Sequence, residues 1–126
     1  MSASANLSSC PQCLELMCQK IRHAEEPDNP SLISEWMSLA SCPAEKPIAQ
    51  RRRSCVVQFN LLLDTIADEC LPVHWRNSCL DNIYYPLLKL KHLANCKESD
   101  AQVNSMFYEL RVMGQYLAAG LTYPRQ

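Results

Sequence analysis

The most apolar long segment of the chain is CVVQFNLLLDTIADEC, residues 55–70. Apolar residues recur in it at intervals of three and four, which places them on one side of a helix with about 3.6 residues per turn. Val57 and Leu61 add an apolar pair on the opposite side of the first half, and a helix that is apolar on two sides packs between neighbours. The segment therefore predicts a central helix near residues 48–70.

Capping residues, prolines and apolar periodicity predict four further helices around this segment. Their expected limits are Ser9 to before Pro27, Asn29–Pro30 to Ser41, an apolar series from Leu80 to Ala94 after a break at Pro72, and Ser99 to Gly120. The predicted fold class is all-α, a single compact bundle of about five helices. We expect one domain over residues 9–121, a flexible N-terminal tail over 1–8 and a C-terminal tail over 122–126.

Two positions inside these helices predict special packing. The apolar spacing of the fourth helix continues through Pro86, so we expect one helix that is kinked where proline removes the bond to the Asn82 carbonyl. Gly114 lies within the apolar stripe of the last helix, where glycine costs about 1 kcal/mol relative to alanine. Its presence predicts a close crossing with another helix.

Length and charge narrow the class of protein. The 126 residues fit one domain, and a formal net charge of −1 gives no overall attraction to nucleic acid or an anionic membrane. No run approaches the roughly eighteen apolar residues of a membrane span, and the N-terminus lacks the pattern of a signal peptide. We expect an intracellular protein, cytoplasmic or nuclear, whose eight cysteines are thiols or metal ligands.

Glycine is scarce, with only Gly114 and Gly120 in the whole chain. Phosphate-binding loops and nucleophile elbows need glycine for positive φ or for close backbone approach, so active sites of those kinds are disfavoured. No local cysteine–histidine pairing and no paired carboxylates predict a nucleophile or an acid–base couple. The sequence therefore predicts a protein that is not an enzyme.

Cysteine and histidine positions leave a zinc site open without requiring one. His92 and Cys96 are four residues apart and share a helix face, and they could complete a tetrahedral site with Cys10 and Cys13. The alternative is that these cysteines are buried or surface thiols, so no cofactor is assigned. Two weaker candidate sets are Cys10, Cys13, Cys18 with His23, and Cys70, His74 with Cys79.

Arg51, Arg52 and Arg53 form the only dense charge run. Arginines at a helix N-terminus oppose the helix dipole, so their position points either to a partner or to a solvated helix start. The following Ser54 completes an R-R-x-S pattern that is compatible with phosphorylation.

Aromatic residues supply the other candidates for a partner surface. We expect an exposed apolar patch near Trp36, Trp75 and the kink at Pro86. Tyr85 is a further predicted partner-binding residue. It belongs to the segment YYPLL, which matches short adaptor motifs, although the overlap of this segment with the apolar stripe favours a buried kink.

These observations predict a non-enzymatic protein-interaction module, such as an adaptor, a complex subunit or a viral-accessory-type factor, that binds a protein partner through an exposed apolar groove. The alternative is a zinc-stabilised helical domain that contacts nucleic acid or a regulatory partner through Arg51–Arg53. Homo-oligomerisation is compatible with both.

Overall fold

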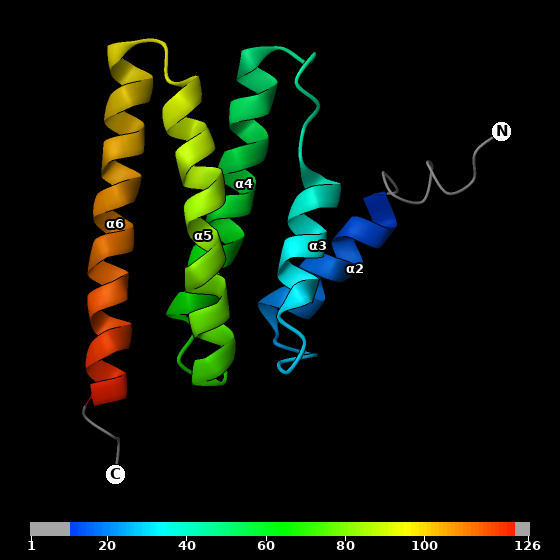
Figure 1. Cartoon of the computed structure of the whole chain (residues 1–126), viewed down its shortest axis with the longest axis vertical. Helices are drawn as coiled ribbons and strands as arrows, with labels where there is room; N and C mark the ends of the chain where they lie inside the picture. The colour runs from blue at the N-terminus through cyan, green and yellow to red at the C-terminus, as the bar shows by residue number, and fades with distance from the viewer. Residues whose placement is uncertain (1–10, 123–126) are drawn as a thin grey trace, which may run out of the picture.

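The computed structural model describes residues 11–122, with side chains described from 12 to 117. These residues form five helices and no strand: α2 (Pro11–Arg22), α3 (Ser31–Ala40), α4 (Ile48–Ala67), α5 (Val73–Leu93) and α6 (Lys97–Thr122) (Figure 1). The predicted all-α bundle is confirmed. The predicted tails fall outside the described residues, apart from Thr122, which belongs to α6.

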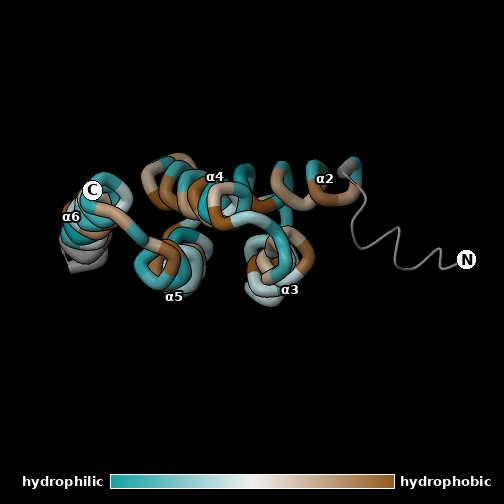
Figure 2. The backbone as a smooth tube through the Cα atoms, turned by 90° about the horizontal axis from the view of Figure 1, so that it is seen from above, coloured by the Kyte–Doolittle hydropathy of each residue, from teal (hydrophilic) through white to brown (hydrophobic). Residues whose placement is uncertain are grey.

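The helices are arranged in two layers. Seen from above, α2 and α4 lie in one layer and α3 and α5 in the other, with α6 along one edge (Figure 2). The helix α4 contacts each of the other four, and its most extensive interface is with α5. A central helix was predicted near residues 48–70, and α4 occupies that place.

The buried side of α4 follows the predicted stripe, and its fully buried members are Phe59, Leu62 and Ile66. The opposite side differs from the prediction. Val57 is 60% exposed and lines an open hollow with Leu14 of α2, because α2 and α3 leave that side of α4 uncovered. Leu61, the other member of the predicted pair, is partly buried against the core, so the prediction of contact on two sides fails only at Val57.

The fourth predicted helix is a single helix, since α5 runs through a buried Pro86 without interruption. The kink at Pro86 stays a prediction. The close crossing predicted at Gly114 is wrong, because a Cβ built there meets no atom within 4 Å. Gly120 does not end α6, which continues to Thr122.

The start of α6 also differs in detail from the capping box predicted at Ser99. The helix begins at Lys97, and the Ser99 hydroxyl lies inside its first turn. That hydroxyl accepts hydrogen bonds from the backbone N–H of Asn95 (3.1 Å) and of Cys96 (3.2 Å). Ser99 therefore caps the helix by reaching back to the residues before it.

At one end of the bundle, side-chain hydrogen bonds join three helices, and we call it the closed end. It is where α2 and α4 finish and α5 begins. The buried Trp75 donates its indole N–H to the Ile21 carbonyl at 2.9 Å, and the Arg76 Nε–H donates to the Ile66 carbonyl at 2.7 Å. Across its surface Arg22 pairs with a carboxylate of the α4–α5 connection at 2.7 Å.

Candidate functional site

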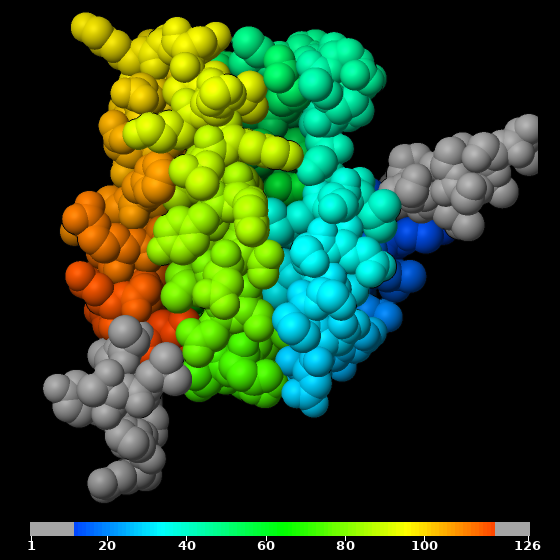
Figure 3. Space-filling model, in the orientation of Figure 1, coloured from blue at the N-terminus to red at the C-terminus, as the bar shows by residue number. Residues whose placement is uncertain are grey.

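A groove opens in the other half of the bundle, between α5 and the segment where α3 ends and α4 begins. Figure 3 shows the surface hollowed there, with α4 at its base. Its upper hollow has a volume of about 500 Å³, within the range of ligand-binding pockets. The residues that line it are Ser41, Cys42, Ala44, Arg51, Ser54, Cys55, Gln58, Tyr85, Leu88, Lys89, His92 and Leu93.

A lower hollow of about 290 Å³ continues the groove towards the middle of α3. It shares Ser41, Gln58, Tyr85 and Lys89 with the upper hollow and adds Ser34, Met37, Ser38, Asn82 and Pro86. We call the two hollows together the α3–α5 groove. Along α5 the groove runs from residue 82 to residue 93, which is about 16 Å at about 1.5 Å per residue.

The edge of the groove that α5 forms carries exposed apolar side chains. Tyr85 is 63% exposed and Leu88 is 55% exposed. Together with Lys89 and His92 they follow the spacing i, i+3, i+4, i+7, so one outward face of α5 borders the groove. Tyr85 and its neighbour Leu88 belong to the predicted motif YYPLL, whereas Lys89 was not predicted; it could have been found as one of the residues of α5 that lie off the buried apolar stripe.

Tyr85 lies in the groove but not as part of an extended motif. The segment YYPLL is helical within α5, and its Pro86 and Leu87 are buried. A short adaptor motif of this kind must be extended and accessible to be recognised. The structure therefore presents Tyr85 and Leu88 as part of a helix face, and the burial expected for this segment is wrong at Tyr85.

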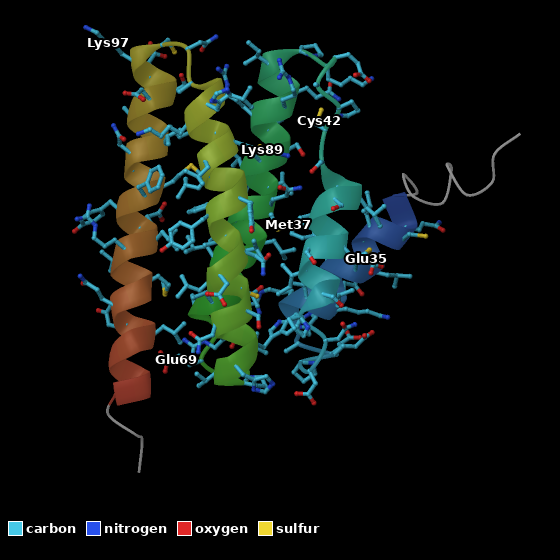
Figure 4. The ribbon with its side chains drawn as sticks, viewed as in Figure 1. Glu35, Met37, Cys42, Glu69, Lys89 and Lys97 are labelled. Carbon is cyan, nitrogen blue, oxygen red and sulfur yellow. The ribbon has the colours of Figure 1, made fainter. Side chains whose placement is uncertain are left out.

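The charged side chains of the groove are all basic or potentially basic, namely Arg51, Lys89 and His92. No aspartate or glutamate lines either hollow. Glu35 of α3 lies on the side of that helix away from α5, whereas Lys89 reaches from α5 towards α3 (Figure 4). Among the described residues, no ion pair joins Arg51 or Lys89 to a carboxylate.

Lys89 spans the groove where its two hollows meet. Its Nζ lies 3.5 Å from the Ser41 hydroxyl, just beyond the end of α3. This distance is at the outer limit for a hydrogen bond, and the side chain is exposed. The contact is therefore weak, and the flexible four-carbon side chain of lysine can break it by changing rotamer.

The three predicted arginines do not form one patch. Arg51 lines the α3–α5 groove, whereas Arg53 lines the hollow on the α2 side of α4. Arg52 donates to the Leu93 carbonyl at 3.3 Å and to Asn95 Oδ1 at 2.8 Å, so it ties α4 to the C-terminal end of α5. Successive helix positions diverge by about 100°, which separates the three side chains.

Two cysteines, Cys42 and Cys55, line the upper hollow. Burial raises the pKa of the Cys55 thiol, which keeps it protonated. Among the described residues, no hydrogen bond links Cys42 or Cys55 to His92. The neighbouring Ser54 hydroxyl donates to the Ala40 carbonyl at 3.1 Å, so it is engaged in joining α4 to the end of α3.

Among the described residues, the structure does not bring Cys13 together with His92 and Cys96, the other predicted zinc ligands. Cys10 lies outside the described residues, and Cys13 lies in α2, whose C-terminal end is bonded to Trp75. His92 is 17 residues beyond Trp75 (92 − 75) along α5, about 25 Å away. Figures 1 and 2 place the start of α2 and the α5–α6 connection that holds Cys96 on opposite sides of the bundle. Within the described residues, no group of three or more potential ligands could hold a metal.

The two tryptophans occupy a different place from the one predicted. Trp36 is 1% exposed and Trp75 is 0% exposed, so neither contributes to an exposed patch. Trp36 packs in the core with Leu32 and Ile33 of the same helix, and these residues share its helix face. That spacing was visible in the sequence and indicated burial.

Comparison with protein-family models, with curated proteins and with solved structures finds no match for this chain. None of the helices in the described part of the chain combines the length and the apolar character needed to cross a membrane.

Proposed function

We propose that this chain is a non-enzymatic interaction module and that its α3–α5 groove binds a segment of a partner protein. The observation that carries the proposal is the open, elongated groove with Tyr85 and Leu88 exposed along its edge. Exposed aromatic and aliphatic side chains beside a concave surface are typical of sites where a partner inserts an apolar anchor.

The dimensions of the groove favour a peptide segment over a compact ligand. Its two hollows lie in line along about three turns of α5, and both are open to solvent. A partner helix laid between α3 and α5 would place apolar side chains one turn apart into successive hollows. Burial raises the pKa of the Cys55 thiol in the upper hollow, which is unfavourable for a nucleophile at that position.

Peptide selection provides a direct test. A phage-displayed library of random 16-residue peptides is panned against the full chain, and the selected peptides are synthesised. Their affinities are then measured for the wild type and for Tyr85→Ser. We expect Tyr85→Ser to weaken binding by about tenfold, because an exposed aromatic side chain at the centre of an interface contributes about 1–2 kcal/mol.

Tyr108→Ser is the matched control, because Tyr108 on α6 is also 63% exposed and does not line the groove. Binding to this control should stay within twofold of the wild type. Peptides that bind the wild type and Tyr85→Ser equally well would contradict the proposal.

A further inference from the structure

We infer that the partner segment is acidic and carries an apolar anchor with a carboxylate about one helical turn away. This carboxylate pairs with Lys89 in place of Ser41. Once Lys89 has moved, the two hollows form one continuous channel. This inference rests on the proposed function of the α3–α5 groove. It adds the chemistry of the partner and a role for Lys89 as a movable strap.

The charges of the groove carry the first part of the argument. Arg51, Lys89 and His92 line it, no carboxylate does, and Glu35 faces away. The cations Arg51 and Lys89, without carboxylate partners in the described part of the chain, give the groove a positive potential, which attracts acidic segments and repels basic ones. Across an interface, this arrangement selects between partners more than it adds affinity.

The position of Lys89 carries the second part. It is one of four residues that line both hollows, and its Nζ bridges towards Ser41 through a contact of 3.5 Å. A carboxylate offers this ammonium a shorter hydrogen bond between two charged groups, in place of a long contact with an uncharged hydroxyl. A partner with a carboxylate therefore forms an ion pair with Lys89 and at the same time breaks the contact between Lys89 and Ser41.

The lining of the groove favours a protein over a nucleic acid. Leu88, Leu93 and the aromatic ring of Tyr85 form much of the surface, and they match apolar side chains better than a phosphate backbone. The two neighbouring arginines do not enlarge the positively charged surface of the groove. Arg52 is bonded to the end of α5, and Arg53 lies on the α2 side of α4. A phosphate-binding track needs several aligned cations.

The peptides from the selection described above also test this inference. Those that depend on Tyr85 should be enriched in aspartate and glutamate three or four residues from an apolar residue. Lys89→Glu should weaken their binding about tenfold, and raising the salt concentration from about 50 to about 200 mM should weaken binding to the wild type.

Lys91→Glu is the matched control. Lys91 is exposed on the same helix but lies 5.8 Å over the Phe107 ring of α6, outside the groove. Binding to this variant should stay within about twofold of the wild type. Equal losses for Lys89→Glu and Lys91→Glu would overturn the inference, because only a general charge effect would then remain.

Ser41→Ala tests the strap itself. Without the hydroxyl, Lys89 is already released, so the same peptides should bind at least as tightly as to the wild type, and up to about twofold tighter. The Nζ resonance of Lys89 in an ¹⁵N-lysine NMR spectrum should shift when peptide binds, and that of Lys91 should not. An unchanged Lys89 Nζ resonance in the peptide-saturated complex would contradict the inference that Lys89 moves when the peptide binds.

The outcomes separate the two proposals. If no selected peptide depends on Tyr85, the proposed function fails. If peptides depend on Tyr85 but are neutral or basic and ignore Lys89→Glu, only the acidic partner is rejected. Binding of a single-stranded or duplex oligonucleotide that is lost in Lys89→Glu would reject the choice of a protein partner.

Discussion

The closed end and the α3–α5 groove use the same kinds of side chains in opposite ways. At the closed end, Trp75 and Arg76 each donate to a backbone carbonyl of another helix at 2.9 Å or less. In the groove, Tyr85 is largely exposed, and Lys89 reaches only a 3.5 Å contact. Trp75 and Arg76 are bonded within the fold, while Tyr85 and Lys89 are exposed to solvent.

This difference separates residues that stabilise the fold from residues that are available to a partner. Polar groups that are bonded and buried lose stability when they are removed, because their partners are left unsatisfied. Exposed groups with weak contacts can be replaced with little effect on folding. The substitutions below are arranged from the largest expected effect to the smallest.

Thiol reactivity should differ most sharply between the two halves of the molecule. Burial raises the pKa of Cys79, one turn beyond Trp75, to about 12, whereas the Ser99 hydroxyl lowers the pKa of the exposed Cys96 beyond the groove end. At pH 8 a thiol of pKa about 12 is about one part in ten thousand thiolate. Iodoacetamide followed by peptide mass spectrometry should therefore modify Cys96 at least about a thousandfold faster than Cys79.

The pH dependence has a defined direction. A lowered pKa keeps Cys96 ionised to lower pH, so its reaction should level off at a lower pH than that of a small model thiol. Ser99→Ala should move this profile back towards the model thiol, because the hydrogen bond that stabilises the thiolate is lost. Similar rates of alkylation for Cys96 and Cys79 would contradict the predicted difference in thiol reactivity between the two halves of the molecule.

Removal of an aromatic side chain should destabilise the closed end far more than the groove. Trp75→Ala should lower the free energy of unfolding by about 3–5 kcal/mol, through a cavity and an unpaired Ile21 carbonyl. Tyr85→Ala should change it by no more than about 0.5 kcal/mol. Urea titration followed by circular dichroism measures both, and equal losses would contradict the assignment of Tyr85 to a binding surface.

Substitution of the cationic side chains Arg76 and Lys89 should give a smaller difference in the free energy of unfolding. Arg76→Met should reduce the free energy of unfolding by about 1–2 kcal/mol, because it removes a charged donor from the Ile66 carbonyl at the end of α4. Lys89→Met should leave stability within about 0.5 kcal/mol of the wild type, since its contact with Ser41 is weak. The same titration applies, and a loss for Lys89→Met as large as that for Arg76→Met would show that the strap is part of the fold.

Gly114→Ala should have the smallest effect, and it should be favourable. Gly114 lies on the part of α6 whose Met113 and Leu117 line a hollow beside the closed end, and an added Cβ meets nothing there. Alanine should therefore raise the free energy of unfolding by about 0.5–1 kcal/mol through helix propensity alone. A destabilised variant would mean that the helices approach more closely at this point than the structure indicates.

The sequence predicted the helices well because each rests on local signals. Apolar periodicity and the prolines at 30 and 47 place the starts of α3 and α4 correctly, whereas the apolar series predicted for α5 begins only at Leu80, after the true start at Val73. Where a prediction needed the distance between helices, it failed: Gly114 has no close neighbour, and Val57 is exposed. Local sequence determines which face of a helix is apolar, but the neighbours determine how much of that face is covered.

The groove was only partly predictable for the same reason. Tyr85 and Arg51 were named from the sequence, yet the hollow that contains them exists only because α3 stops at Ala40 and the chain crosses to α4 at a distance from α5. Trp36 and Trp75 were predicted to lie near an exposed apolar patch because aromatic residues are common in binding surfaces. Their three- and four-residue spacing from other apolar residues was the more reliable signal.

The extensive interface between α4 and α5 has a consequence for how the chain reaches its structure. These helices are joined by only five residues, 68–72, so their contacts form between segments that are close in sequence. Short loops close quickly and with little loss of chain entropy. Folding is therefore expected to begin with the α4–α5 hairpin, onto which α2, α3 and α6 assemble, and amide hydrogens of this hairpin should be the last to exchange.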